Sequence, residues 1–244
     1  AMKVYLAMMD TDADGNLSLP VSVSPEYRGA QINAWGKNAS FQLACCHRLV
    51  ENLIEAADVL GETPEAEWLN VREKLPKACF IEFKTHRGDT LRKIALWDGT
   101  PLEESHRHHS HLGGITPFDV LDPNDPEWRS VIVESLNEWV LRGPGLWSGW
   151  CIPWAAAIHT RFDNGDMAEI LLDTWQRVYT NQGHGTLHDV SVPGFSLMGG
   201  SAVEVGPRGS GDQEVMQMDA GMGAVATIME MLCHVRRGVA HIFP

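Results

Sequence analysis

The sequence lacks any run of about 20 apolar residues, the length that a transmembrane helix requires. We therefore expect no membrane-spanning segment and no membrane partner. Basic residues are also scarce, because 19 Lys and Arg stand against 32 Asp and Glu, which gives a formal net charge of −13. Since this charge repels polyanions, the composition argues against general binding to nucleic acid.

Cysteine is sparse as well, and the five residues form an odd number that is not typical of a disulfide framework. Cys45, Cys46, Cys151 and Cys233 fall in apolar stretches with helical spacing. We expect small buried side chains there rather than nucleophiles. The 244 residues are 44% hydrophobic, which suffices for one sizeable core, and we treat residues 1–244 as one domain.

Histidine, by contrast, is concentrated in one place. Four of the 11 histidines lie within six residues, in the segment Ser105–Leu112. Such a cluster can ligate a metal, hydrogen-bond the hydroxyls of a sugar, or tie loop carbonyls together as a structural element. Arg107 lies among the rings, and a fixed cation beside a metal is unfavourable. The pattern therefore favours a donor-rich site without a metal, and the structural alternative stays open.

The same segment carries a family resemblance. Its sequence HRHHSHL, followed by Gly114 and Pro117, resembles the HRH-x-SHL-x-G-x-x-P signature of glycoside hydrolase family 95. A single short motif would be weak, but four blocks occur in the family's order between about residue 17 and residue 244. The other three blocks are Ser24-Pro25-Glu26, Gly149-Trp150 with Trp154, and Gln217-Met218-Asp219 with Gly221, Gly223 and Glu230-Met231-Leu232.

The resemblance implies an (α/α)6-barrel catalytic domain with inverting α-L-fucosidase or α-L-galactosidase activity of the exo type. Glu26 would be the general acid, and Asp219 would activate the attacking water. In an inverting enzyme the two carboxyl groups lie about 6.5–9.5 Å apart, which is the separation that we expect here. Glycines 221 and 223 would let the backbone approach a ligand closely.

The resemblance assigns sugar binding to a second set of residues. The imidazoles and the guanidinium of the histidine segment would contact sugar hydroxyls. Indole faces can stack on the apolar faces of sugar rings, with packing in the core as the alternative for each tryptophan. No cofactor and no metal are implied. The predicted substrate-binding residues are His106, Arg107, His108, His111, Trp150 and Trp154.

Two other interpretations compete with this hydrolase. One is a non-catalytic carbohydrate-binding or scaffold fragment that lacks the upstream half of the active site. The other is a metal-dependent hydrolase that uses the histidine cluster. Turnover separates the first alternative from an enzyme, and sensitivity to a chelator separates the second.

Helical spacing of apolar residues predicts a mainly α fold with a small N-terminal β component. A complete barrel has twelve helices, whereas six or seven are predicted, so the domain resembles an incomplete barrel without accessory β-domains. Its possible partners are the missing N-terminal half and a second copy of the chain. The predicted helices cover residues 41–60, 64–75, 127–142, 149–162, 168–179 and 215–235, and the predicted strands cover residues 80–83 and 92–97.

Residues 10–15 have the D-x-D-x-D-G pattern that opens a calcium loop, but Val21 occupies the position of the expected bidentate Glu. A hairpin turn between strands at 4–9 and 17–23 is favoured, with bound calcium as the alternative. Ser40 and Thr63 are predicted as helix N-caps. The Gly-rich stretch 182–211 predicts a functional or mobile loop, with His184, His188 and Asp189 as polar candidates.

Overall fold

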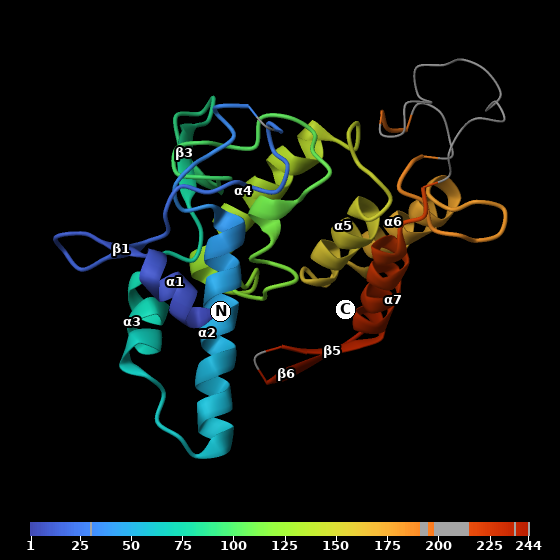
Figure 1. Ribbon diagram of the computed structural model, residues 1–244. Helices are drawn as coiled ribbons and strands as arrows, with labels where there is room; N and C mark the ends of the chain where they lie inside the picture. The colour runs from blue at the N-terminus through green and yellow to red at the C-terminus, as the bar shows by residue number, and fades with distance from the viewer. Residues whose placement is uncertain (30, 191–194, 198–214, 237, 244) are drawn as a thin grey trace. The chain divides into compact units, whose positions relative to one another are not determined.

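The computed structural model describes residues 1–29, 31–190, 195–197, 215–236 and 238–243 (Figure 1). Helices dominate the regular structure, and the strands of the described part form three two-stranded antiparallel hairpins. The mainly α prediction is therefore confirmed, whereas the barrel remains a prediction. The chain divides into two compact units, residues 1–102 with 110–138 and residues 103–109 with 139–244. None of the described helices combines the length and the apolar character needed to cross a membrane.

The core of the first unit is built on α2, Ser40–Leu60. Its apolar residues recur every three or four positions, so one face of the helix is buried. Gly61 ends the helix in the left-handed conformation with φ 71°, as glycine at this position predicts. The residues of this core are Met2, Leu17, Leu19, Leu43, Cys46, Val50, Val71 and Leu75.

The N-cap predicted for α2 is wrong. Ser40 is the first helical residue, Ala39 is the N-cap, and no side chain caps the helix. The Ser40 hydroxyl instead accepts a hydrogen bond from the backbone N–H of Cys79 at 3.1 Å. The Ser40 hydroxyl therefore fixes the backbone at Cys79, the residue before the next strand.

The N-terminal apolar run also differs from the prediction, because residues 2–8 form helix α1 (Met2–Met8) rather than a strand. The hairpin itself is confirmed, although β1 (Asp10–Thr11) and β2 (Leu17–Ser18) have two residues each. Asp12 organises the turn by accepting hydrogen bonds from the backbone of Asp14 and from the backbone and side chain of Asn16. These bonds, the Asn16 side chain first, lower the pKa of the Asp12 carboxyl.

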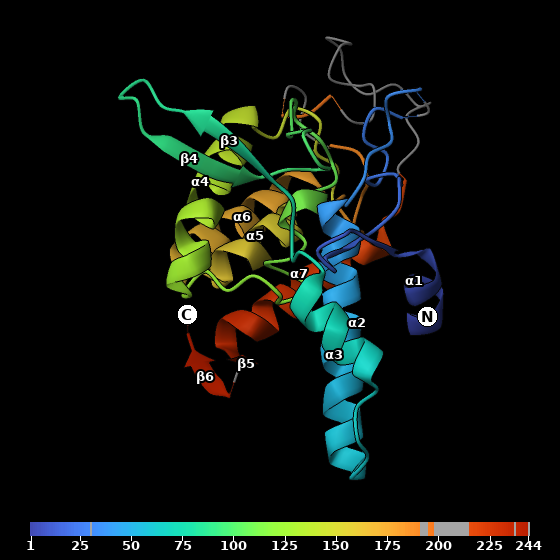
Figure 2. The same cartoon turned by 90° about the vertical axis from the view of Figure 1, so that its left-hand side faces the viewer.

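Helix α3 spans Ala66–Lys74 and begins two residues later than expected. Its N-cap is Glu65 rather than Thr63, because the chain stays extended through Pro64 and Glu65. The first predicted strand is confirmed as β3 (Phe80–Lys84). The second lies earlier than the predicted 92–97, as β4 (Thr90–Ile94), and the two form an antiparallel pair (Figure 2). Helix α4 follows at Pro126–Arg142.

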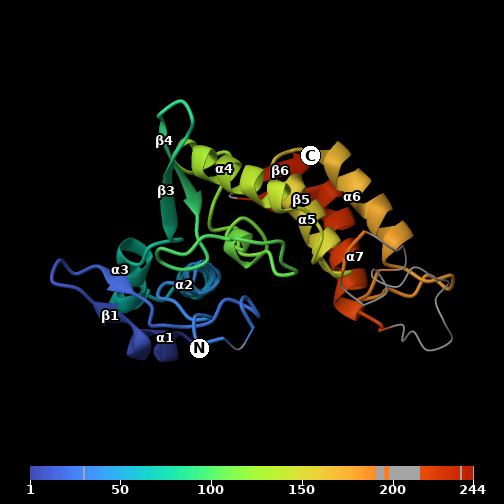
Figure 3. The same cartoon turned by 90° about the horizontal axis from the view of Figure 1, so that it is seen from above.

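In the part of the second unit that the structure describes, three whole helices follow the end of α4: α5 (Cys151–Thr160), α6 (Gly165–Val178) and α7 (Met218–Leu232). Helix α5 packs against both α6 and α7 (Figure 3). It is almost wholly apolar, and most of its residues are buried, as expected for an inner helix. The residue after it, Arg161, is 4% exposed and forms a bidentate ion pair with Glu230 of α7, at 2.7 and 3.1 Å.

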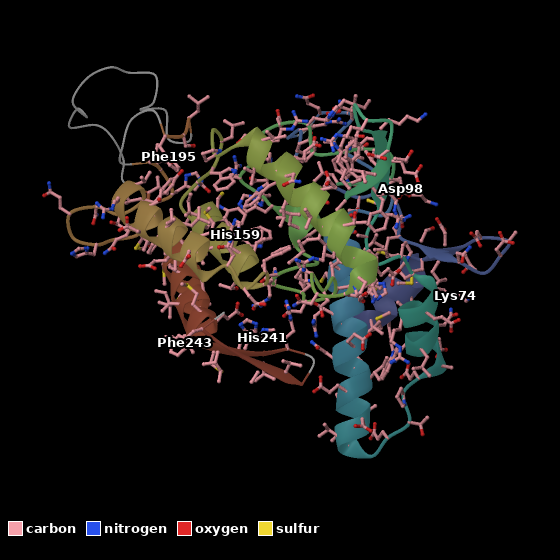
Figure 4. All side chains as sticks on the ribbon, turned by 180° about the vertical axis from the view of Figure 1, so that it is seen from behind. Lys74, Asp98, His159, Phe195, His241 and Phe243 are labelled. Carbon is pink, nitrogen blue, oxygen red and sulfur yellow. The ribbon has the colours of Figure 1, made fainter. Side chains whose placement is uncertain are left out.

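The end of the chain corrects the prediction for the last helix. Helix α7 ends at Leu232, and residues to Ile242 form a hairpin of β5 (Cys233–Arg236) and β6 (Val239–Ile242). In this hairpin His234 pairs with His241, and the centroids of their stacked rings are 4.7 Å apart. Figure 4 labels His241. Cys233 is exposed there, contrary to the expected burial, while all five cysteines are free thiols.

Candidate active site

The histidine segment is divided between the two compact units. His106 to His109 belong to the second unit, and Ser110 and His111 belong to the first. Ser110 and His111 lie in a short 3-10 helix, η1 (Ser110–Leu112), and both are buried. The four histidines therefore have different environments, although they are neighbours in the sequence.

His109 is a structural residue of the second unit. It is 0% exposed, and the centroid of its ring lies 4.9, 4.7 and 5.3 Å from the ring centroids of Trp139, Trp147 and Trp154. The indole N–H of Trp139 donates to His109 Nδ1 at 3.1 Å. Because Nδ1 accepts this hydrogen bond, the imidazole is neutral and its proton is on Nε2. Nε2–H donates to the carbonyl oxygen of Cys151 at 3.1 Å. For this histidine the structural interpretation of the cluster is correct.

His106 and His108 are partly exposed and border an aromatic surface. The backbone N–H of His108 donates to His106 Nδ1 at 3.0 Å, which orients the first ring. The His108 ring meets the Trp150 ring edge-on, with the ring centroids 4.8 Å apart. Trp150 stacks on Trp154, with the ring centroids 5.5 Å apart. Two indoles with a polar imidazole at their edge form a surface that suits the apolar face and the hydroxyls of a sugar ring. Four predicted binding residues are thus brought together.

Arg107 is held through its own backbone by the side chain of Cys151 on α5. Its carbonyl accepts a hydrogen bond from the Cys151 thiol at 2.8 Å, and that sulfur accepts one from the N–H of Ser148 at 3.2 Å. Burial is the main cause that raises the pKa of Cys151 to about 12. Cys151 is therefore a protonated structural donor rather than a nucleophile, as the sequence predicts.

Glu26 lies on a tight turn whose neighbours are buried. Ser24 is 1% exposed and Tyr27 is 2% exposed, and the N–H of Tyr27 donates to the carbonyl of Ser24 at 3.2 Å. Glu26 itself is exposed and has a positive φ of 54°. The hydroxyls of Ser24 and Ser110 share a hydrogen bond of 2.7 Å, which joins this turn to η1. The first unit therefore places the Glu26 turn beside the His111 end of the histidine segment.

Asp219 is an exposed residue in the first turn of α7, as the sequence predicts. The prediction that nearby glycines face a ligand receives no support. A side chain at Gly221 would meet Thr186 at 3.0 Å, so the close approach there is to the protein itself.

Gln217 precedes Asp219 and was not assigned a role from the sequence. Its Oε1 is buried and, within the part of the chain that the structure describes, accepts no hydrogen bond. It lies close to Gly149, where a Cβ would be 3.0 Å from Oε1 and only 1.8 Å from the carbonyl oxygen of Leu187. The close passage of Leu187 explains why glycine precedes Trp150. The sequence signal that could have pointed to Gln217 was its position, as a polar residue, in the motif Gln217-Met218-Asp219.

His188 and Asp189 contact each other within the stretch 182–211, of which residues 191–194 and 198–211 lie outside the described part. His188 Nδ1 and Asp189 Oδ1 are 2.6 Å apart. The backbone of His188 links two motif blocks, because its carbonyl accepts from Gly149 N–H at 3.0 Å and its N–H donates to Val215 at 2.8 Å.

Two further observations concern ligands. Among the described residues, no group of three or more His, Cys, Asp or Glu side chains is arranged to hold a metal ion. A groove of about 550 Å³ lies on the second unit, lined by residues of α6 and α7, by Thr180 and His184, and by Phe243. His184, a polar candidate of the stretch 182–211, lines this groove, but none of the predicted catalytic or substrate-binding residues does, so the groove is distinct from the candidate site.

Comparisons with known proteins agree with the motif blocks. Residues 1–232 match the model of the glycosyl hydrolase family 95 catalytic domain. The chain is also 28% identical over 196 residues to "Probable alpha-fucosidase A" of Aspergillus oryzae, which covers 76% of this chain. The match spans only 24% of that relative's length. The motifs and the family match together show that the chain belongs to the glycosyl hydrolase family 95 catalytic domain family.

Proposed function

We propose that this chain carries catalytic residues of an inverting, exo-acting glycoside hydrolase that cleaves α-L-fucosides or α-L-galactosides. The observation that carries the proposal is the family match over residues 1–232, which includes both candidate carboxylates. The name of the Aspergillus relative supports a fucoside as the substrate. The exposed positions of Glu26 and Asp219 leave both carboxylates accessible to solvent and to a ligand.

Glu26 is the proposed general acid. Its carboxyl group gives a proton to the glycosidic oxygen while the bond from that oxygen to the anomeric carbon breaks. The turn that carries Glu26 is held by buried Ser24 and Tyr27, which limits the directions in which the side chain can point. This restraint supports a role that requires a defined orientation.

Asp219 is the proposed general base. It takes a proton from water as the water oxygen bonds to the anomeric carbon from the face opposite to the leaving group. The base must be ionised before the reaction, and Asp219 lies in the N-terminal turn of α7. After one cycle Glu26 is ionised and Asp219 is protonated, and exchange with solvent restores both.

The sugar itself is the proposed ligand of the histidine segment. Trp150 and Trp154 supply a stacked indole surface, and His108 supplies a polar edge beside it. We assign hydroxyl contacts also to His106, Arg107 and His111. No metal or cofactor is assigned a role in this mechanism.

Hydrolysis of two substrates tests the two carboxylates separately. Because the chain matches only a quarter of its relative, the assay uses the chain with and without the relative's flanking segments. Glu26→Gln is expected to retain activity on an aryl fucoside with a good leaving group and to lose activity on a fucosyl disaccharide. Asp219→Asn is expected to lose both activities, and Glu67→Gln, at an exposed position of α3, serves as the control.

The stereochemistry of the first product provides an independent check. Proton NMR during turnover is expected to show inversion at the anomeric carbon, and retention would refute the inverting mechanism. Wild-type activity in the Glu26→Gln variant on both substrates would refute the assignment of the acid. The hydrolase proposal fails if neither the chain nor its mixture with the flanking segments cleaves either substrate.

A further inference from the structure

The turn that carries Glu26 has a backbone conformation that must be held in place. The N–H of Tyr27 donates to the carbonyl of Ser24, so residues 24–27 form a reverse turn with Pro25 and Glu26 at its centre. Glu26 has a φ of 54°, in the left-handed region that residues other than glycine rarely adopt. Such a conformation persists only where the surrounding structure holds the turn at both ends.

Tyr27 holds the end of this turn by aromatic packing. Its ring lies against Trp97, with the ring centroids 5.8 Å apart, and Trp97 is 0% exposed. This contact fixes where the turn ends. The start of the turn, at Ser24, needs a contact of its own.

Ser24 is held by a hydrogen bond between two buried hydroxyls. The hydroxyl oxygens of Ser24 and Ser110 are 2.7 Å apart, and the two residues are 1% and 2% exposed. Among the residues that the structure describes, each of these hydroxyls bonds only to the other. Ser110 begins η1, in which His111 is the next residue. The bond therefore joins the Glu26 turn to the segment that carries His111, and all of these residues belong to the first unit.

We propose that Ser24 and Ser110 are positioning residues for the general acid. Their hydrogen bond sets the separation between Glu26, which protonates the glycosidic oxygen, and His111, which contacts the sugar. A hydrogen bond suits this task because its length and angle vary within narrow limits. This inference deepens the proposed function and rests on it, since it assigns residues that place the acid relative to the substrate.

The leaving group of the substrate tests the positioning role. An aryl fucoside with a good leaving group needs little help from an acid, whereas a fucosyl disaccharide requires protonation. The full 244-residue chain is assayed with and without the flanking segments of the Aspergillus relative. Ser110→Ala is expected to lower kcat about tenfold or more on the disaccharide, because a displacement of about 1 Å can lower a rate about 100-fold. On the aryl fucoside the loss should stay below about threefold, and Ser24→Ala should behave in the same way.

Ser135→Ala is the matched control in the same unit. Ser135 is also 2% exposed, and its hydroxyl donates to the carbonyl of Val131 and accepts from the N–H of Ile94. This change removes buried hydrogen bonds without touching the Glu26 turn. We expect it to lower the stability while leaving the ratio of the two activities unchanged.

The double variant of Ser24→Ala and Ser110→Ala tests whether the two serines act as a pair. Either single change already breaks the hydrogen bond between them. The double variant is therefore expected to lose no more activity on the disaccharide than Ser110→Ala alone.

Hydrogen exchange tests the same contact without reference to turnover. The amide of Tyr27 exchanges when its bond to the Ser24 carbonyl opens. NMR is expected to show exchange of this amide about threefold or more faster in Ser110→Ala than in Ser135→Ala. Because the control also loses buried hydrogen bonds, a difference between the two variants reports on the turn rather than on global unfolding.

Several outcomes overturn the proposal. These are equal losses on both substrates in Ser110→Ala, the same change of ratio in Ser135→Ala, losses that multiply in the double variant, and equal exchange of the Tyr27 amide in Ser110→Ala and Ser135→Ala. A chain that shows the expected exchange but hydrolyses no fucoside would support the link between the turn and η1 and count against the proposed function. The two failures are therefore distinguishable.

Discussion

Replacing His109 with phenylalanine is expected to destabilise the second unit while leaving its shape intact. The phenyl ring preserves most of the side-chain volume and the edge-to-face contacts with Trp139 and Trp147. It removes the hydrogen bond from the Trp139 indole and the one to the Cys151 carbonyl. The Trp139 indole N–H would then be buried without an acceptor, whereas the Cys151 carbonyl would keep the hydrogen bond that its position in the first turn of α5 gives it.

The size of the effect follows from the two lost partners. A buried polar group left without its hydrogen bond costs about 1–3 kcal/mol, and the lost bond to the Cys151 carbonyl adds about 0.5–1.5 kcal/mol, so the change costs about 1.5–4.5 kcal/mol. For a chain of this length, 1 kcal/mol lowers Tm by about 2–4 °C. A loss of about 3 kcal/mol therefore corresponds to a fall of about 6–12 °C.

Urea unfolding followed by tryptophan fluorescence measures this loss, because the indoles around His109 report on its surroundings. The control is His108→Phe in the same segment, where the side chain is partly exposed. We expect this control to lose less than about 1 kcal/mol, as for most surface changes. A free energy of unfolding within about 0.5 kcal/mol of wild type for His109→Phe would refute the structural role of the histidine.

The remaining predictions concern stability. Glu230→Gln leaves Arg161 buried without its counter-charge and should cost about 2 kcal/mol in urea unfolding, less than a fully buried pair because Glu230 is 33% exposed. The matched change Asp173→Asn, in the exposed pair with Arg177, should lower the stability much less, and equal losses would contradict this reasoning. Burial lowers the pKa of His47 below 6.5, so protons bind the unfolded chain more tightly, and stability should fall as the pH drops below about 6.5. His47→Gln should make the fall between pH 7 and pH 5 shallower, and an unchanged slope of the urea midpoint against pH would contradict the assignment.

The helices could be predicted from the sequence because their signals are local. Residues 41–60 repeat apolar side chains at helical spacing and are followed by Gly61, and the structure confirms both features. The caps were harder to predict, because a serine can serve a distant partner. The Ser40 hydroxyl binds the backbone of Cys79, which is 39 positions away. No local rule contains that information.

Short apolar runs were the other source of error. Residues 4–9 have no clear period, so strand and helix could not be separated, and packing of Met2 into the core of α2 accompanies the observed helix. At the other end of the chain, residues 233–235 continue an apolar pattern but pair with residues 240–242 in a hairpin. Pairing between strands decides such a segment, and pairing is a tertiary contact.

The sequence by itself determined the family, the mainly α class and the position of Asp219 at a helix start, because motif order, helical periodicity and helix boundaries are properties of neighbouring residues. Only the tertiary structure decided the roles within the histidine segment. His109 became a core residue because three indoles and the Cys151 carbonyl surround it, whereas His108 borders the Trp150 and Trp154 surface. Adjacent residues in an extended segment point in different directions, so the fold, rather than the spacing, separates the structural histidine from the candidate ligand.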